Sequence, residues 1–206
     1  MISLNAENEQ EFQNIYELFH EKIRRYLARM VNETEAEDLS QEVFVKVSRG
    51  LKDFKRQSSL STWIYTIATN TAMDSLRTLS LRKEALVVQR GDDGVEAEDT
   101  YLLTEDYKPS LEATLIKKEM NDCIRGIVDG LPENYRTVLV LSDLEGFSDA
   151  EIADIAGISL ETEKIRLHRA RTRLRKALEA LCNFYRDESN ELACERTFTP
   201  LKFRNN

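Results

Sequence analysis

The sequence predicts an all-α protein with two helical domains. Seven Gly and three Pro are few for 206 residues, and this scarcity disfavours a turn-rich β fold. Apolar residues make up 41% of the chain, and they recur at three- and four-residue steps through two long blocks, as in amphipathic helices. A polar, acidic stretch separates the blocks, so we expect two small domains rather than one large one.

The first block, residues 9–81, is predicted to hold three helices. Thr34, with Glu37 three residues later, matches a capping box and predicts the start of a second helix that ends at Gly50. His20, on the first helix, is interpreted as a surface residue. Trp63 shares an apolar stripe with Ile67 on the third helix, so we expect it to pack in the core. The apolar face of the first helix comprises Phe12, Ile15, Tyr16, Phe19, Ile23, Tyr26, Leu27 and Met30.

Residues 82–110 are predicted to be a flexible linker. This segment includes GDDGVEAEDTYLLTEDYKPS, which combines acidic runs with two glycines and a proline. Such a composition buries too little apolar surface to offset the entropy of an unfolded chain.

The second block, residues 111–181, contains a helix-turn-helix pattern. Two short helices that cross steeply need small residues at their contact, a residue that tolerates positive φ in the turn, and an N-cap for the second helix. Ala153 and Ala156 supply the contact, Gly157 the turn, and Ser159 the cap. We therefore expect helices over 148–156 and 160–181, preceded by helices over 111–131 and 134–144. Residues 182–206 form a tail of unknown role.

The charge distribution is unequal. The net charge is −8, and residues 121–163 hold two basic and ten acidic side chains. Residues 164–182 hold seven basic side chains and one acidic one. An acidic protein with one cationic helix is expected to bind free DNA weakly and to need a partner that holds it on the DNA.

The long helix of the helix-turn-helix has a predicted DNA-facing side. Leu167, Ala170 and Leu174 mark its buried stripe, and Thr172 lies roughly opposite. Flanking cations suit phosphates, and the central side chains suit base edges. A solvated helix of a small bundle is the alternative. The predicted contact residues are Glu161, Lys164, Ile165, Arg166, His168, Arg169, Arg171 and Arg173.

Two sequence blocks resemble one family. FSDAEIADIAGISLETEKIRLHRARTRLRKAL resembles the C-terminal promoter-binding region of extracytoplasmic-function (ECF, group 4) sigma factors of the sigma-70 family. AEDLSQEVFVKVSRGL followed by STWIYTIATNTAMDSLR resembles the N-terminal region of the same family. The resemblance covers residues 9–181 and implies two DNA-binding domains, sigma region 2 over 9–81 and sigma region 4 over 111–181.

The resemblance also implies site residues. The second helix would dock on the clamp helices of the largest subunit of core RNA polymerase, through Asp38, Leu39, Gln41, Glu42 and Val45. For Leu39, ordinary core packing is the alternative.

The connector and the third helix would open and read the −10 promoter element, through Lys55, Arg56, Gln57, Ser58, Ser59, Asn70 and Arg77. The cationic helix would read the −35 element. Glu163 departs from the family pattern, which usually has Val there, and helical phase puts it on the buried stripe.

Other classes of function fit poorly. The sequence has no phosphate-binding loop, nucleophile elbow or HExxH motif, so we expect no enzyme, no metal and no cofactor. Cys182 and Cys194 are too widely spaced for zinc, which leaves a redox-sensitive pair or two inert thiols. The aromatic residues Phe184, Tyr185 and Phe198 suggest that the tail binds a partner. With no membrane span or signal peptide, a cytoplasmic location is expected.

Two rival interpretations remain at this point. A conventional transcriptional regulator would bind operator DNA alone, whereas a sigma factor needs core polymerase. A helical adaptor protein would give no promoter-specific transcription with core enzyme. The family resemblance further implies control by an anti-sigma factor.

Overall fold

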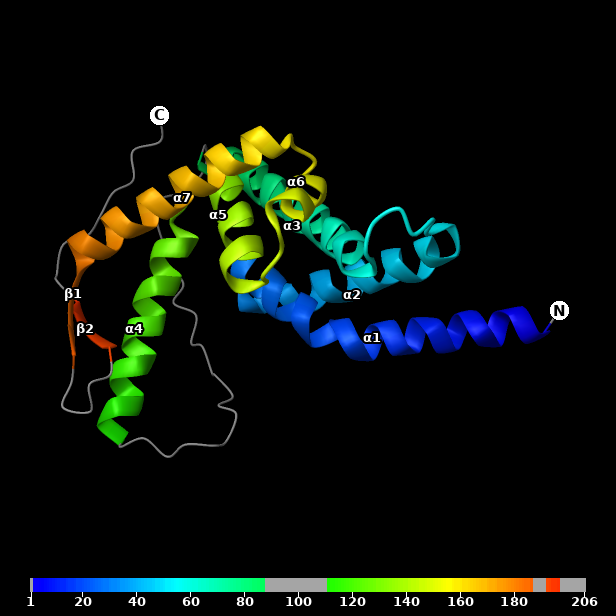
Figure 1. Ribbon diagram of the computed structural model, residues 1–206, viewed down its shortest axis with the longest axis horizontal. Helices are drawn as coiled ribbons and strands as arrows, with labels where there is room; N and C mark the ends of the chain where they lie inside the picture. The colour runs from blue at the N-terminus through cyan, green and yellow to red at the C-terminus, as the bar shows by residue number, and fades with distance from the viewer. Residues whose placement is uncertain (1, 88–110, 187–191, 197–206) are drawn as a thin grey trace. The chain divides into compact units, whose positions relative to one another are not determined.

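The computed structural model describes residues 2–87, 111–186 and 192–196 (Figure 1). Within this part of the chain there are two compact units. One comprises the described residues 2–87 together with 140–164, and the other comprises 111–139 together with 165–186 and 192–196. The linker is predicted over 82–110, but its first six residues, 82–87, belong to the helix that ends at Val87. The rest of it, 88–110, lies outside the described residues.

Three long helices make up most of the first unit. They are α1 (Ile2–Met30), α2 (Glu33–Gly50) and α3 (Leu60–Val87), and a short 3-10 turn, η1 (Leu51–Asp53), follows α2. Most of the predicted apolar face of α1 is buried, with Ile23, Tyr26, Leu27 and Met30 fully enclosed, whereas Phe12 and Tyr16 are half-buried. Tyr26 packs against Tyr65 of α3, and its hydroxyl is 2.7 Å from Thr69 Oγ1, so the polar atom of this buried ring has a partner.

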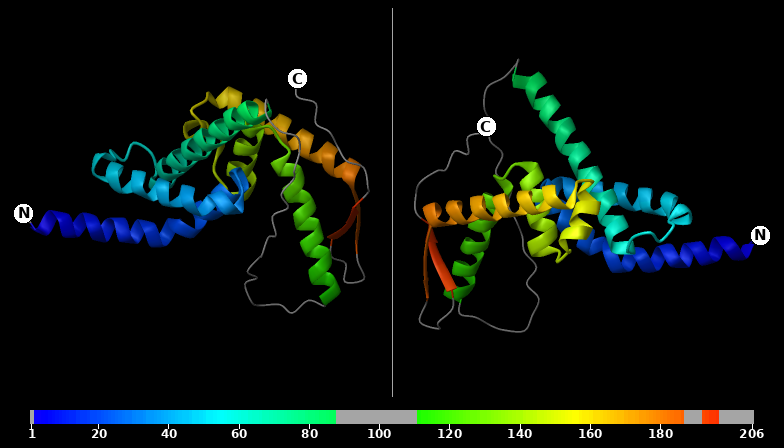
Figure 2. Two further views of the ribbon diagram at one scale, coloured as in Figure 1. Left: turned by 180° about the vertical axis from the view of Figure 1, so that it is seen from behind. Right: turned by 45° about the horizontal axis from the view of Figure 1, so that its top comes forward.

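The first unit also contains residues 140–164. They form η2 (Val140–Leu144), a π-helical turn, and α6 (Asp149–Ala156), and they include the first turn of α7 (Leu160–Leu181). α6 packs on α3 (Figure 2). The loop before α6 contacts the same surface, where Phe147 meets the Tyr65 ring edge-on with 4.7 Å between the ring centroids.

The second unit combines helices with a small β-hairpin. Its described elements are α4 (Leu111–Asp129), α5 (Glu133–Leu139), the remainder of α7, and the antiparallel strands β1 (Cys182–Arg186) and β2 (Leu192–Arg196). Phe184 pairs with Cys194 in this hairpin. An apolar cluster joins α4, α7 and the hairpin.

The all-α fold class is confirmed, with local corrections. The hairpin in the tail was not predicted. The cap of α2 is Asn32 rather than Thr34, because Asn32 has an extended backbone and its side chain accepts a hydrogen bond of 2.9 Å from the Glu35 amide. His20 is not a free surface residue, since its ring stacks on Tyr16 with 4.6 Å between centroids.

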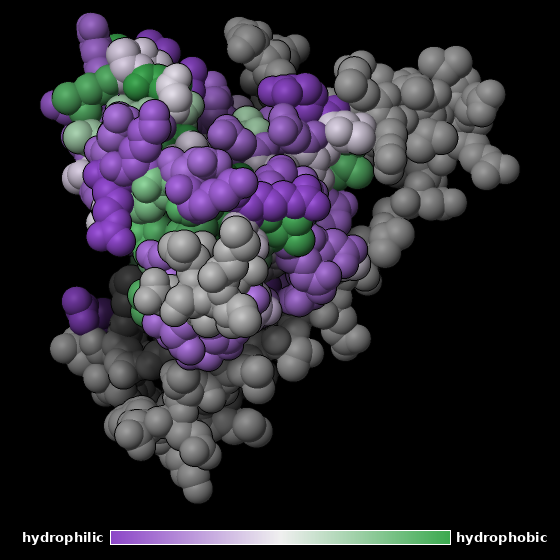
Figure 3. All heavy atoms as spheres, turned by 90° about the vertical axis from the view of Figure 1, so that its right-hand side faces the viewer, coloured by the Kyte–Doolittle hydropathy of each residue, from purple (hydrophilic) through white to green (hydrophobic). Residues whose placement is uncertain are grey.

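One face of the molecule is mainly polar where its residues are described. On the face shown in Figure 3, hydrophilic side chains predominate and the apolar ones form small separate groups. Among the described helices, none has a stretch of sufficient length and hydrophobicity to cross a bilayer.

Candidate polymerase and promoter interfaces

α2 has one buried face and one exposed face. Its buried residues are Ala36, Ser40, Val43, Phe44 and Val47. The residues predicted to bind polymerase lie off that face, with Asp38, Gln41 and Glu42 exposed and Leu39 half-buried. Val45 is 47% exposed, which is high for an apolar residue on a charged helix face. The structure therefore leaves this set of side chains available to another molecule.

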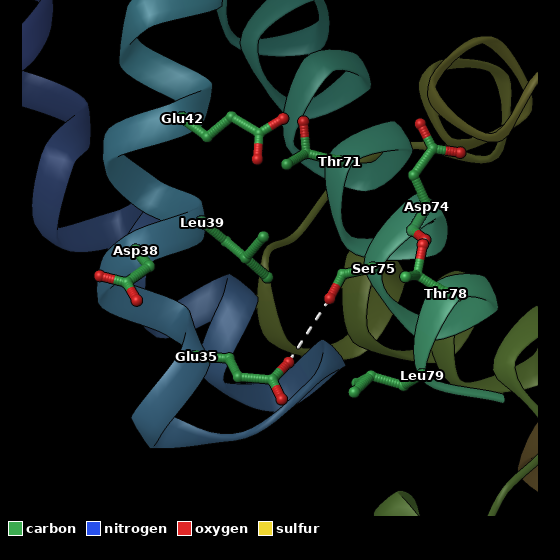
Figure 4. Close-up of a pocket in the computed structure, with 9 residues that line it drawn as sticks. All are labelled: Glu35, Asp38, Leu39, Glu42, Thr71, Asp74, Ser75, Thr78 and Leu79. Atoms are coloured by element: carbon green, nitrogen blue, oxygen red, sulfur yellow. Dashed lines mark hydrogen bonds between the residues drawn. The ribbon is translucent and has the colours of Figure 1, made fainter. Parts of the chain in front are cut away.

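A groove of about 420 Å³ lies between α2 and α3 beside these residues (Figure 4). Leu39 and Glu42 of α2 point toward α3 across it. At the end of the groove away from Glu42, the Ser75 hydroxyl is 3.4 Å from Glu35 Oε2. The side chains lining the groove are Glu35, Asp38, Leu39, Glu42, Thr71, Asp74, Ser75, Thr78 and Leu79.

The groove is acidic. Lys46 forms an ion pair of 2.8 Å with Glu42 and donates a hydrogen bond of 2.9 Å to Thr71. Arg77 forms an ion pair of 3.1 Å with Asp74. Glu35 and Asp38 have no cationic partner of this kind within the described part of the chain. A cationic surface, in particular one rich in arginine, fits such a groove, because carboxylates bind guanidinium groups in two-bonded pairs.

The connector between η1 and α3 is exposed. Lys55, Arg56, Gln57, Ser58 and Ser59 all present their side chains to solvent. Arg56 has φ +55, and no other non-glycine residue in the described backbone has a positive φ. Its guanidinium lies 3.7 Å from the Glu11 carboxylate and remains 81% exposed, so this ion pair contributes little stability.

A second hollow, of about 330 Å³, lies at the connector and is lined by Glu11, Phe54, Arg56, Ser58 and Leu60. Phe54 also stacks on Trp63 with 4.8 Å between centroids and 23° between ring planes. Trp63 is thus half-buried against the connector. Its ring lies 3.1 Å from where a Cβ would be at Gly50, so the end of α2, the connector and the start of α3 fit closely.

Ser59 has a structural role in addition to its predicted one. Its hydroxyl oxygen accepts a 3.0 Å hydrogen bond from the Thr62 amide and caps α3. Asn70 and Arg77 are exposed farther along α3. Arg77 lies 17 residues beyond Leu60, about 25 Å along the helix axis. The structure therefore places Arg77 beside the acidic groove and not at the connector.

The helix-turn-helix has the predicted local geometry. Ser148 and Glu151 form a complete capping box at the start of α6. Hydrogen bonds from Ser148 lower the pKa of Glu151, because they stabilise its charged form. Gly157 adopts the left-handed conformation, φ 63 and ψ 38. Ser159 accepts a 3.2 Å hydrogen bond from the Thr162 amide at the start of α7.

α7 separates buried from exposed side chains as predicted. Leu167 and Ala170 are buried. Glu163 is fully buried, in agreement with its helical phase. Arg166 is half-buried, and the Arg173 guanidinium lies over the Tyr135 ring, 4.5 Å from its centroid. The remaining predicted contact residues are exposed: Glu161, Lys164, Ile165, His168, Arg169 and Arg171.

Comparison with known proteins assigns the family. The model described as sigma-70 region 2 matches residues 15–82, and the model described as sigma-70 region 4 matches residues 121–174. RNA polymerase sigma factor SigZ of Bacillus subtilis is 30% identical over 176 residues, which cover 85% of this chain and 91% of SigZ. ECF RNA polymerase sigma factor SigW of the same organism is 33% identical over 173 residues, covering 82% of this chain and 90% of SigW.

This chain belongs to the ECF group of the sigma-70 family. As an ECF sigma factor, it is a transcription-initiation factor that binds core RNA polymerase and directs it to promoters. The rival interpretations, a regulator acting alone and a helical adaptor, are therefore discarded.

Solved structures share the fold of this ECF sigma factor. Sigma factor RpoE of Bartonella quintana, solved with the anti-sigma factor NepR, has a TM-score of 0.62 and 24% identity over 82% of this chain and 98% of RpoE. CnrH, solved with the cytosolic domain of CnrY, has a TM-score of 0.55 and 21% identity over 84% of this chain and 90% of CnrH.

Some features of these surfaces were not anticipated. The α3 wall of the groove, including Thr71, Asp74 and Thr78, lies 29 or more residues beyond Glu42 in sequence. The four-residue step from Asp74 to Thr78 could have indicated a shared helix face. Phe54 was passed over because it stands alone between polar residues, yet it stacks on Trp63.

Proposed function

We propose that the exposed face of α2 and the adjoining acidic groove bind the clamp helices of the largest polymerase subunit. The support is the exposure of Asp38, Gln41, Glu42 and Val45 on a helix whose opposite face is buried. Leu39 lines the groove and supplies an apolar contact within it. Carboxylates at a fixed spacing set the register of a cationic partner, and an apolar centre contributes affinity.

We propose that the connector and α3 bind the −10 element. The hollow at Phe54, Arg56 and Ser58 offers an aromatic ring, a cation and a hydroxyl group, and these suit an unstacked base. Lys55, Gln57 and Ser59 flank it, and Asn70 extends the polar surface along α3. Arg77, at the far end, suits the DNA backbone rather than the same base.

We propose that α7 reads the −35 element. Its exposed first half presents Glu161, Ile165 and His168 to base edges, with cations beside them for phosphates. The cations are Lys164, Arg166, Arg169, Arg171 and Arg173.

The domain division that we propose places sigma region 2 at 9–81, a linker at 82–110 whose first residues continue α3, sigma region 4 at 111–181 and a tail at 182–206. Polymerase would hold both regions on DNA at once. Two weak contacts then act together through a high effective concentration, and an acidic chain binds DNA selectively only in the assembled enzyme.

Three further proposals concern regulation, the absence of catalysis and location. An anti-sigma factor is proposed as the inhibitor, supported by the complexes of RpoE with NepR and of CnrH with CnrY. The chain is proposed to be non-enzymatic, with catalysis left to polymerase. It is proposed to act in the cytoplasm, where core polymerase and the chromosome are.

A charge reversal on α2 tests the proposed polymerase interface. Asp38→Lys places a cation in the acidic groove, and we expect affinity for purified core polymerase to fall about tenfold, or ~1.4 kcal/mol. Glu37→Lys is the matched control, because Glu37 is an exposed neighbour on α2 outside the groove lining. Equal losses in the two variants, measured by fluorescence anisotropy, would contradict the proposed site.

A further inference from the structure

The second unit gathers three thiols that are distant in sequence. Cys123 lies on α4, Cys182 begins β1, and Cys194 lies in β2; they are 7%, 4% and 8% exposed. Each strand of the hairpin thus contributes one cysteine to the cluster that it forms with α4. The cluster is otherwise apolar and includes Ile127, Ala177, Met120, Leu174, Leu178 and Leu181.

Cys123 and Cys182 contact each other directly. Their Sγ atoms are 3.2 Å apart although the residues are 59 positions apart in sequence. None of these three cysteines forms a disulfide bond in the structure. A disulfide bond is about 2.05 Å long, so the two sulfurs need to approach by only about 1 Å. Cys194 faces the same side of the hairpin as Cys182, because it pairs with Phe184, two residues along β1.

Metal binding explains the cysteine cluster less well than disulfide formation does. Within the described ranges, no group of three or more His, Cys, Asp or Glu side chains has an arrangement that could hold a metal ion. Structural zinc generally takes four nitrogen or sulfur ligands, and this cluster offers three thiols among aliphatic side chains. Two sulfurs in contact are instead arranged for two-electron oxidation.

We propose that Cys123 and Cys182 form a reversible intramolecular disulfide when the protein meets a hydroperoxide. One thiolate attacks the peroxide oxygen, which breaks the O–O bond and gives a sulfenic acid and an alcohol, or water from hydrogen peroxide. The second thiol displaces the sulfenic oxygen as water and forms the S–S bond. Two electrons pass from the two sulfurs to the peroxide. A small-molecule dithiol returns both electrons and restores the thiols.

The surroundings set the speed of this reaction. Burial, together with the neighbouring thiols, raises the pKa of Cys182 to about 12. Because the thiolate is the nucleophile, we expect oxidation to be slow at neutral pH and to accelerate as the pH rises. This site would therefore respond to sustained exposure rather than to a brief pulse.

The bond would enclose the DNA-binding part of the chain. The loop from Cys123 to Cys182 contains α5, α6 and all of α7. Closing a loop of this length lowers the entropy of the unfolded chain, so the oxidised protein is expected to melt at a higher temperature than the reduced protein.

Peptide mapping of the unaltered full chain tests the proposal. The reduced protein is treated with hydrogen peroxide, remaining thiols are alkylated in denaturant, and the chain is cleaved with trypsin. The three cysteines fall in separate tryptic peptides, 119–125, 177–186 and 187–196. We expect peptide 119–125 linked to 177–186 in a monomeric chain, alkylated 187–196, and loss of the link after dithiothreitol.

Other results would overturn the proposal: a main link that includes 187–196, a link between two chains, or three thiols that remain alkylatable. Cys194→Ala is the matched control and should still form the link, whereas Cys182→Ala should not. If circular dichroism shows that either variant is misfolded, the peptide map of the unaltered chain still tests the proposed disulfide.

Discussion

The Tyr65 hydroxyl donates a 2.6 Å hydrogen bond to Glu145 Oε2, and the residues are 80 positions apart. The other carboxylate oxygen of Glu145 accepts a 2.8 Å hydrogen bond from Arg29. The Glu145 side chain is only 11% exposed, so these two donors take the place of water around its carboxylate. They join the loop before α6 to α1 and α3 in the first unit.

Removing this charge should destabilise the protein. Glu145→Gln keeps the shape of the side chain but weakens two charge-assisted hydrogen bonds, and we expect a loss of about 1–2 kcal/mol in the free energy of unfolding. Urea denaturation followed by circular dichroism measures it. Glu179→Gln, at an exposed carboxylate on α7, is the control and should leave the midpoint unchanged. A midpoint for Glu145→Gln equal to that of the wild type would show that the pair adds no net stability.

Stability should fall in alkaline solution. Burial raises the pKa of Tyr26, and burial followed by the hydrogen bond to Glu145 raises the pKa of Tyr65. Both hydroxyls keep their protons in the folded protein at a pH where the unfolded chain, with a tyrosine pKa of about 10, releases them. The contribution is thus fully present below about pH 10 and is lost as the pH rises further. Urea midpoints measured from pH 8 to 11 should fall less steeply for Tyr65→Phe; parallel curves would contradict this origin.

A side chain at Gly157, in the turn of the helix-turn-helix, should destabilise the protein. Gly157 has φ +63, and a left-handed conformation costs a residue with a Cβ about 1–2 kcal/mol. We expect Gly157→Ala to lower the free energy of unfolding by about 1 kcal/mol. Gly126→Ala is the matched control, because Gly126 lies within α4 and a Cβ there meets no atom within 4 Å. It should raise stability by up to about 1 kcal/mol. A change of the same sign in the free energy of unfolding of both variants would contradict the role of the left-handed conformation.

Trp63 should report on the connector. It is the single tryptophan of the chain and stacks on Phe54. Phe54→Ala removes one face of the stack, so we expect stronger quenching of the tryptophan fluorescence by acrylamide and weaker opening of promoter DNA by the holoenzyme. Phe184→Ala, at a residue of β1 that is 43% exposed, should change neither. Unchanged quenching in Phe54→Ala would mean that the stack does not shield Trp63.

Arginines along α7 should differ in their effect on promoters. Arg169 is exposed and belongs to the proposed −35 surface, whereas Arg175 is exposed outside it. We expect Arg169→Ala to lower transcription by the holoenzyme from a −35-dependent promoter by about tenfold, since a phosphate or base contact contributes ~1–3 kcal/mol. Arg175→Ala should stay within about twofold. The same loss for both would indicate a general charge effect rather than a located contact.

Local chemistry could be predicted from the sequence, and long-range contacts could not. The Gly157 turn and the Ser159 cap depend on side chains within three residues, so their pattern identifies them. Asn32 and Thr34 are both capping residues, and only the backbone conformation at Asn32 decides between them. The contact between Cys123 and Cys182 depends on the path of α7 and of the hairpin, which no short spacing reveals.

The same distinction between local and long-range features applies to the candidate surfaces. Helical phase alone predicts that Glu163, Leu167 and Ala170 are buried. The groove beside α2 could not be predicted, because it exists only where α3 packs against α2. No local sequence motif determines that packing. The hairpin was missed because NFYR and LACER have little of the β-branched alternation typical of strands.

α7 has 22 residues in one uninterrupted helix, a rod of about 33 Å. The DNA major groove is about 12 Å wide, so a rod entering it by its first turns extends well past the duplex. The far end of α7, which packs against α4 and the hairpin, would then lie beyond the duplex, so substitutions in the hairpin should leave base recognition unchanged.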